Sequence, residues 1–391
     1  MKRILHISNK PIYPLVDGGC VAMHQFCQSL YQVADTEVYH LCISTPKHAY
    51  ARKDYERNNV QFKEFDNVQI DTSIRVKDGA LTTLKGKSYH LARFNSTALI
   101  DKIQSWIIQH NIDVIIFDSL YSAAILAQTS FPIPCYIRSH NIESELWVQK
   151  AKQGGWKAPI YRQLAKSLAK EEKALLQKVD GVLFISKDDQ GEILKQNIHI
   201  KSCVTPVGIQ TIQNETRFHP NRYHFIGAMN WFPNQEALHI LLNEIFPKIK
   251  AANPESELHL AGSYFPEDIV SDAEKGITVH GFVSDATAFR RSHGVQIMPI
   301  QAGSGVRIKL IEALSEGIPV VATPIAVFGM DEGIENCCKI EKNSTDLANA
   351  ALELNENSEI RHRLTQNGRN FVEEHFSIES IAQKIAKFIY T

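Results

Sequence analysis

Hydrophobic positions in the first half of the chain fall into short apolar runs, separated by segments with a helical pattern. In residues 95–110 (NSTALIDKIQSWIIQH), apolar residues recur at the three- and four-residue spacing of an amphipathic helix. Strands that are apolar at every position and alternate with such helices are typical of a parallel sheet covered on both faces. The first half is therefore predicted to be a doubly wound α/β domain. The predicted strands lie at residues 4–7, 38–43, 114–117, 135–137, 182–185 and near 204.

The pattern pauses over residues 205–222 (TPVGIQTIQNETRFHPNR), a polar stretch with two prolines and no clear period. It then starts again, which predicts a second doubly wound domain of the same Rossmann-like kind. The predicted strands of this domain lie at residues 223–226, 258–261, 277–279, 295–298, 319–322 and 338–340. We predict an N-terminal domain at 1–205, a linker at 206–222, a C-terminal domain at 223–376 and a final helix at 377–391.

Composition narrows the class of protein. The chain has 391 residues, of which 44% are hydrophobic and 22% charged, an ordinary balance for globular domains. A net charge of -1 argues against a dedicated nucleic-acid binder. Seven scattered cysteines without a C-x-x-C argue against a disulfide framework or a cysteine zinc site. No apolar run approaches the ~18 residues of a membrane span. These features predict a cytoplasmic protein.

The charge is unevenly distributed between the two halves. Residues 1–210 carry 26 Lys and Arg against 20 Asp and Glu, so the second half is net acidic. The segment 77–94 (KDGALTTLKGKSYHLARF) combines basic and apolar residues. Such a basic half is suited to an anionic membrane leaflet or a phosphorylated acceptor, which predicts peripheral contact with the inner leaflet. Ordinary scatter of surface charge is the alternative.

The segment 299–324 (PIQAGSGVRIKLIEALSEGIPVVATP) has the most candidate chemistry. A strand, a loop of small residues and a helix that begins near Val306 or Arg307 form a phosphate-binding arrangement. Arg307 and Lys309 lie in the first helical turn, where cations are unfavourable unless an anion binds there. Glu312, one turn later, is suited to accept both hydroxyls of a ribose. The alternative is a surface Lys309–Glu312 pair at i,i+3 spacing.

Two further loops follow predicted strands of the first half. Gly18 and Gly19 allow close backbone approach to a ligand, and His140 comes directly after a strand. Glu143, just beyond it, opens a helix, where an acid suits the dipole. No G-x-G-x-x-G follows the first strand, which argues against a dinucleotide oxidoreductase. No tight metal-ligand spacing is present, so no metal is expected.

The segment 299–324 resembles the donor-binding segment of family 4 retaining glycosyltransferases of the GT-B fold. DGG near the start, RSHNIE, YHFIGAMNWFPN and GFVSD match other parts of that family in the same order along the chain. The resemblance implies two Rossmann-like domains facing across a cleft, with the acceptor bound by the first and the nucleotide sugar by the second. It also implies that the helix at 377–391 crosses back to the N-terminal domain.

The resemblance assigns roles to residues of the second half. Glu312 matches the second Glu of an E-x7-E motif, which holds the nucleotide ribose, and the first Glu falls at Ser304. The family's G-R-L-x-x-x-K begins at Gly227, where Ala228 and Pro233 occupy the two basic positions.

Arg307 and Lys309 are inferred to neutralise the diphosphate in place of those lost basic residues. His140 resembles a histidine that acts near the donor sugar. Three loops complete the implied site: Gly303, Ser304, Gly305 and Val306 at the donor, Phe282 and Val283 at the base, and Gly18 and Gly19 at the diphosphate and acceptor.

The resemblance implies metal-independent transfer of a sugar, with retention, from a nucleotide-diphosphate sugar to a glycan or lipid-linked acceptor in bacterial cell-surface glycan biosynthesis. No cofactor and no nucleic-acid partner are expected. Two alternatives stay open: a non-catalytic two-domain sugar-binding or scaffold protein, or another GT-B enzyme such as a nucleotide-sugar epimerase. A phosphorylase-like enzyme would need a lysine for pyridoxal phosphate.

Overall fold

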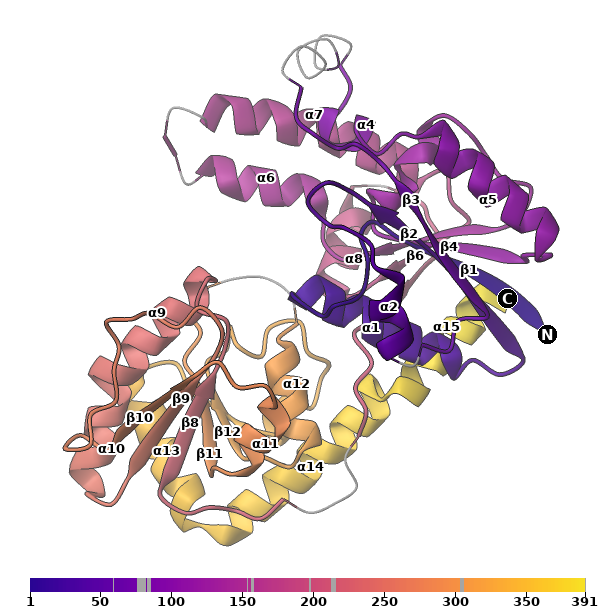
Figure 1. Ribbon diagram of the computed structural model, residues 1–391. Coiled ribbons are helices and arrows are strands. Elements are labelled where there is room, and N and C mark those ends of the chain that lie inside the picture. Colours follow the sequence, from indigo (N-terminus) through magenta and orange to yellow (C-terminus); the bar gives the residue numbers. More distant parts are fainter. Residues whose placement is uncertain are drawn as a thin grey trace. The chain divides into compact units, whose positions relative to one another are not determined.

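The computed structural model describes residues 1–58, 60–75, 82, 86–152, 154–155, 158–196, 198–211, 216–302 and 306–390. The chain divides into two compact units, Met1–Gly208 with Ile381–Thr391 (unit 1) and Ile209–Ser380 (unit 2). Each unit contains one parallel sheet with helices on both faces (Figure 1). The predicted fold class of two doubly wound Rossmann-like domains is confirmed.

Unit 1 has a seven-stranded sheet in the order β3-β2-β1-β4-β5-β6-β7. Its strands are β1 (Lys2–Ser8), β2 (Thr36–Ser44), β3 (Glu64–Gln69), β4 (Val114–Asp118), β5 (Cys135–Ser139), β6 (Gly181–Phe184) and β7 (Ser202–Val204). Its helices are α1 (Gly18–Tyr31), α2 (Arg52–Arg57), α4 (Tyr89–Ala92), α5 (Thr97–Gln109), the 3-10 helix η1 (Ser122–Ala127), α6 (Glu143–Lys152), α7 (Ala158–Leu176) and α8 (Lys187–Lys195).

The central strand β1 shows why its sequence is almost wholly apolar. Leu5 and Ile7 enter the core under α5 and α7, while Ile4 enters the opposite core with α1. Both faces of the strand are therefore buried. The edge strand β3 was not predicted, because its sequence, EFDNVQ, is half-exposed and largely polar.

The last helix, α15 (Ile378–Tyr390), belongs mostly to unit 1. Ile381 and Ile385 are fully buried in the core that α1 also lines, and Figure 1 shows α15 in yellow beside α1. A Cβ on Gly181 would lie 2.7 Å from the ring of Phe388, so β6 needs a glycine at the point where α15 crosses it.

Unit 2 has a six-stranded sheet in the order β10-β9-β8-β11-β12-β13. Its strands are β8 (Arg222–Ile226), β9 (Glu257–Ala261), β10 (Ile277–Gly281), β11 (Val295–Met298), β12 (Val320–Ala322) and β13 (Lys339–Ile340). Its helices are α9 (Phe232–Ile240), the π-helix η2 (Leu241–Ile245), α10 (Phe246–Ala252), α11 (Ala286–Arg291), α12 (Ile308–Ser315), the 3-10 helix η3 (Ile334–Asn336), α13 (Ser344–Glu356) and α14 (Ser358–Phe376).

The structure divides the chain at Gly208/Ile209, inside the predicted linker at 206–222. Residues 212–215 of that linker lie outside the described residues. Within the described part of the chain, no helix is long and apolar enough to cross a membrane.

Candidate active site

The chain order of each sheet reverses between two central strands. In unit 2 the chain runs from β8 outward to β9 and β10, then returns to β11 on the other side of β8. In unit 1 the same reversal lies between β1 and β4. Ligands of open α/β sheets bind beyond the carboxyl ends of the strands at such a switch point. Candidate groups are therefore expected at both switch points.

Lys309, in the first turn of α12, reaches the loop that follows β8. Its Nζ donates to Asn234 Oδ1 at 2.6 Å and lies 4.7 Å from the centre of the Phe225 ring. A Cβ on Gly227 would lie 3.0 Å from Nζ, so the glycine leaves room for the lysine. Burial and the nearby Arg307 lower the pKa of Lys309 to about 7, against a smaller opposing effect of Glu312.

Arg307 is the residue that precedes α12, and its side chain lies over the same loop. The guanidinium carbon is 5.2 Å from the centre of the Trp231 ring, and Nη2 donates to the carbonyl of Ala302 at 3.4 Å. Burial lowers the pKa of Arg307, yet the group stays charged at neutral pH. Two basic side chains and the N-terminus of α12 thus lie at one switch point.

Glu312 lies on α12 and is bound by an arginine of α11. Arg290 Nη1 donates to Glu312 Oε2 at 2.9 Å, and Arg290 Nε donates to both carboxylate oxygens of Glu316 at 3.1 and 3.0 Å. Burial raises the pKa of Glu312, although Arg290 opposes that shift. The alternative of a Lys309–Glu312 surface pair is wrong, because Asn234 binds the lysine and Arg290 binds the glutamate.

The remaining donor residues lie around this centre or outside the described part. Val306 precedes Arg307 and packs against the core of unit 2. Val283 packs on a small cluster with Ile226, whereas the Phe282 side chain is 75% exposed. The predicted residues Gly303, Ser304 and Gly305 lie outside the described residues.

His140 lies in unit 1, directly after β5, and is held by a buried aspartate at the end of β4. Asp118 Oδ1 accepts from His140 Nε2 at 2.6 Å and from Arg138 Nη1 at 2.9 Å. Asp118 Oδ2 lies 2.9 Å from His6 Nε2, on β1. Burial alone would raise the pKa of Asp118, but Arg138 and His140 hold it well below its usual range. The imidazole of His140 is thus oriented by a charged, fully buried carboxylate.

Gly18 and Gly19 begin α1 after β1. Asp17 caps this helix by accepting from the Cys20 amide at 2.9 Å, and it also pairs with Lys10 Nζ at 2.6 Å. A Cβ on Gly18 would meet nothing within 4 Å, whereas one on Gly19 would lie 3.3 Å from Lys10 Nζ. Lys10 therefore places a cation beside the predicted diphosphate loop.

Sequence reasoning missed several residues that hold the candidate groups in place: Lys10, Asp118, Asn234, Arg290 and Glu316. Asp118 carried a usable signal, an acid that ends a wholly apolar strand. Arg290 carried none, because its partners lie 22 and 26 residues away on another helix.

Glu143 opens α6, as predicted, and lies with Glu145 in the first turn of that helix. Glu172 of α7, not Glu143, binds the first amides of α6, accepting from the Glu143 amide at 2.8 Å. The Glu143 side chain is half-buried, and its carboxylate accepts from Tyr121 at 3.1 Å. Burial raises the pKa of Glu143 to about 7.

Comparison with known families agrees with this geometry. Residues 220–357 match the family model described as Glycosyl transferases group 1. This part of the chain is therefore similar to a group 1 glycosyltransferase domain. It contains all six strands of the unit 2 sheet. The prediction of a glycosyltransferase enzyme is confirmed at this level. A search of curated protein sequences finds no match.

Solved structures with similar folds span the whole chain. TarM has a TM-score of 0.68 at 13% identity, covering 100% of this chain and 99% of that one. HepE of Anabaena in complex with UDP has a TM-score of 0.64 at 15% identity, covering 99% of both chains. Sucrose-phosphate synthase of Thermosynechococcus elongatus has a TM-score of 0.64 at 16% identity, covering 99% and 98%. The GT-B fold is therefore confirmed.

The buried ion pair between α11 and α12 gives a first prediction. Arg290→Leu leaves Glu316 as an unpaired carboxylate that is 2% exposed, which should destabilise unit 2 by about 3–5 kcal/mol. The double variant Arg290→Leu/Glu316→Leu should recover part of that loss, because Glu316 no longer remains as an unpaired buried carboxylate, whereas Glu312 still lacks its arginine. Hydrogen exchange of the β11 and α12 amides measures both effects. Wild-type protection in the single variant would contradict the assigned role of the pair.

Proposed function

We propose that this group 1 glycosyltransferase moves a sugar, with retention and without a metal ion at the diphosphate, from a nucleotide-diphosphate sugar to a hydroxyl of a glycan or lipid-linked acceptor. The observation that carries the proposal is the grouping of Arg307, Lys309 and Glu312 around the start of α12 at the switch point of unit 2, with Lys309 beside Gly227. We place the reaction in the cytoplasm, in bacterial cell-surface glycan biosynthesis.

The donor assignment follows from charge. The β8 loop and the start of α12 offer two basic side chains and the first amides of a helix, which suit a diphosphate. Glu312, one turn along α12, offers a carboxylate suited to a ribose, and Arg290 fixes it in place. Among proteins of this fold, HepE of Anabaena is recorded with UDP and with UDP-glucose. We therefore propose UDP-sugars as the first donors to test.

The proposed chemistry is separation of charge. Breaking the bond between sugar and phosphate forms a cationic sugar and an anionic diphosphate. Catalysis requires groups that stabilise this separation more than the bound substrate. Arg307, Lys309 and the α12 amides would stabilise the leaving diphosphate, so no metal is needed for that task.

We assign His140 to the sugar, where it would bond a hydroxyl or support the developing positive charge. Its orientation by the buried Asp118 suits such a positioned group. The acceptor proton would pass to a phosphate oxygen, and retention would follow from attack on the face that the diphosphate leaves. We name no protein nucleophile.

We assign the acceptor from the Gly18–Gly19 loop of unit 1 and from a protein of similar fold. A mutant of TarM from S. aureus is recorded with alpha-GlcNAc-glycerol and UDP, which supports a glycan-type hydroxyl acceptor for this fold. We propose that unit 1 binds the acceptor, with Gly18 and Gly19 allowing close approach near Lys10.

Donor use gives the second prediction. Arg307→Ala and Glu312→Ala should each lower transfer from the preferred nucleotide sugar by more than tenfold, or roughly 1.4 kcal/mol or more in the barrier. The exposed Glu274→Ala is the matched control and should keep the wild-type rate. The assay begins with UDP-, GDP- and ADP-glucose and follows nucleotide release in the presence of an acceptor mixture. Near-native transfer by Arg307→Ala would contradict its assignment to the diphosphate. A transfer rate that rises severalfold on addition of Mg²⁺ would contradict metal independence.

The pKa of Lys309, about 7 in the free protein, gives the third prediction. A bound diphosphate favours the charged amine, so below pH 7 the lysine is already protonated and affinity should be constant. Above pH 7, binding must take up a proton, and affinity should fall by up to about tenfold per pH unit. Calorimetry with UDP-glucose in two buffers of different ionisation enthalpy counts the protons. Equal affinity at pH 6.5 and 8.5, with no proton uptake, would contradict this assignment.

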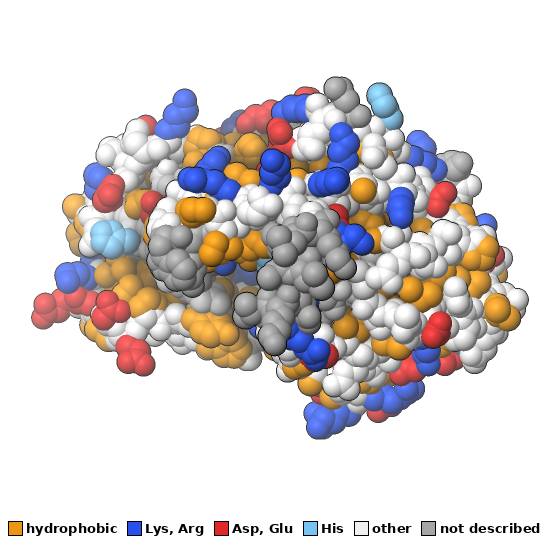
Figure 2. Space-filling view, turned by 90° about the horizontal axis from the view of Figure 1, so that it is seen from above, with side chains coloured by type: hydrophobic (Ala, Val, Ile, Leu, Met, Phe, Trp, Pro, Cys, Tyr) orange, Lys and Arg blue, Asp and Glu red, His pale blue; other side chains and the backbone are white. Residues whose placement is uncertain are grey.

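We also propose that unit 1 contacts an anionic membrane that carries a lipid-linked acceptor. The described part of helices α6 and α7 exposes Leu146, Val148 and Ile160 at 39–52% and is rich in lysine. The face drawn in Figure 2 shows Lys and Arg side chains (blue) interspersed with apolar ones (orange). Apolar contact together with basic charge is the combination that holds proteins at anionic leaflets.

Vesicle sedimentation tests the membrane proposal as the fourth prediction. The protein should bind phosphatidylglycerol vesicles, bind phosphatidylcholine vesicles more weakly, and dissociate at high salt. Lys166→Glu/Lys170→Glu on α7 should weaken binding severalfold, and the charge-matched Lys53→Glu/Lys248→Glu should not. Equal loss in both variants would show that net charge rather than this surface controls binding.

A further inference from the structure

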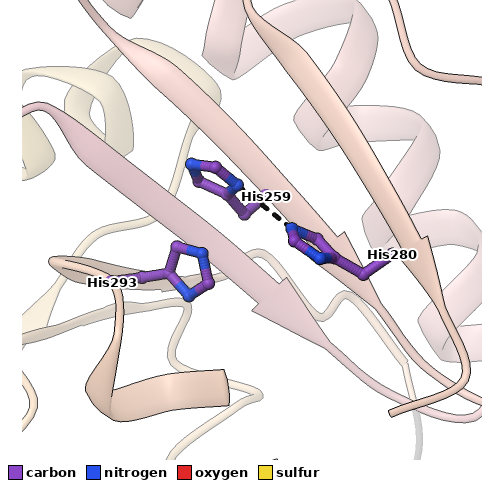
Figure 3. A group of neighbouring side chains, drawn as sticks. All are labelled: His259, His280 and His293. Carbon is purple, nitrogen blue, oxygen red and sulfur yellow. Dashed lines mark hydrogen bonds between the residues drawn. The ribbon is translucent and has the colours of Figure 1, made fainter. Parts of the chain in front are cut away.

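Three histidines that are far apart in the sequence meet on one face of the unit 2 sheet (Figure 3). His259 comes from β9, His280 from the edge strand β10, and His293 from the residues after α11. One ring nitrogen from each lies within 4.8 Å of the other two. The spacing of these histidines along the sequence does not predict that they meet.

The backbone explains why the three rings converge. Strands β9 and β10 are parallel neighbours, and their register shifts between Val279 and Gly281, at His280. His293 is brought over β9 by α11, and its ring centre lies 4.2 Å from that of His259. His259 and His293 are 8% and 5% exposed, whereas His280 is open to solvent.

The far nitrogens of the two buried rings have partners outside the group. His259 Nε2 lies 3.2 Å from Glu257 Oε2, and His293 Nδ1 lies 2.6 Å from the Phe289 carbonyl oxygen. Carboxylates and carbonyls fix the orientation of metal-binding histidines in this way. His259 Nδ1 and His293 Nε2 are left to face the centre of the group.

The near nitrogens already approach the spacing that a metal needs. Tetrahedral zinc with bonds of 2.0–2.1 Å places two ligand nitrogens about 3.4 Å apart. His259 Nδ1 and His280 Nε2 are 3.2 Å apart, the contact dashed in Figure 3. Only modest rotation of His293 is required, since its nitrogen is within 4.8 Å of both.

We propose that His259, His280 and His293 bind one Zn²⁺ ion, with the fourth coordination position open to water beside the exposed His280. Imidazole ligands select zinc and similar divalent transition metals over Mg²⁺. A neutral imidazole is the form that coordinates such an ion.

The ion would join β10 to the end of α11. That helix carries Arg290, which binds Glu312, and His280 precedes Phe282 and Val283 of the predicted base loop. Zinc would thus stabilise the framework of the donor site without contacting the diphosphate. This positioning role rests on the proposed donor site, but the metal site itself does not.

Calorimetry and equilibrium dialysis of the untagged, chelator-treated full chain with Zn²⁺ test the site. One equivalent should bind, and His280→Ala should weaken binding at least tenfold. His239→Ala removes an exposed histidine of α9 and is the matched control, expected to bind as the wild type does. Absence of stoichiometric binding at micromolar zinc, or equal loss in both variants, would overturn the proposal.

A second measurement distinguishes loss of metal binding from misfolding of the His280→Ala variant. Co²⁺ bound to the wild type should give the visible absorption of a tetrahedral site, and His293→Gln should abolish it while circular dichroism stays native. Excess Mg²⁺ should not displace the cobalt. A cobalt spectrum that survives both His280→Ala and His293→Gln would place the metal elsewhere. Because these readouts follow metal binding, failure of the donor assignment would leave them unchanged.

Discussion

A buried charge must be matched by an opposite charge, and unit 2 depends on one such match. Arg290 is 2% exposed and binds both Glu312 and Glu316. An unpaired guanidinium or carboxylate there would be strongly destabilising. The ion pairs therefore fix the position of α11 relative to α12. The position of Glu312, and with it the proposed ribose contact, follows from that constraint.

Unit 1 meets the same constraint with the signs exchanged. Asp118 is fully buried and is bound by three side chains. Arg138 lies on β5, His140 follows the end of β5, and His6 lies on β1. Each unit therefore holds its candidate group, Glu312 or His140, through one buried ion of opposite charge. Such preorganisation suits a reaction that separates charge, because the stabilising groups need not rearrange as the charge develops.

The donor site also shows how a changed motif can keep its chemistry. The positions after β8 where the resemblance expects an arginine and a lysine hold Ala228 and Pro233. Lys309 approaches the same loop from α12 and binds Asn234, next to Gly227. A basic side chain is thus retained at this loop although it comes from a different element. Residues 220–357 match the group 1 glycosyltransferase model although this motif is changed.

The sequence by itself determined the two parallel sheets, because strands buried on both faces must be apolar at every position, and that signal is local. It missed β3, whose edge position permits a polar sequence. It also indicated His140, which directly follows a predicted strand, and Arg307, Lys309 and Glu312, which lie in the first turns of the helix that follows another one. Only the tertiary structure decided their partners: Arg290 for Glu312, Asp118 for His140, and the meeting of His259, His280 and His293. Those contacts join residues on different elements, and the order of strands in the sheet, not their spacing along the chain, sets which elements touch.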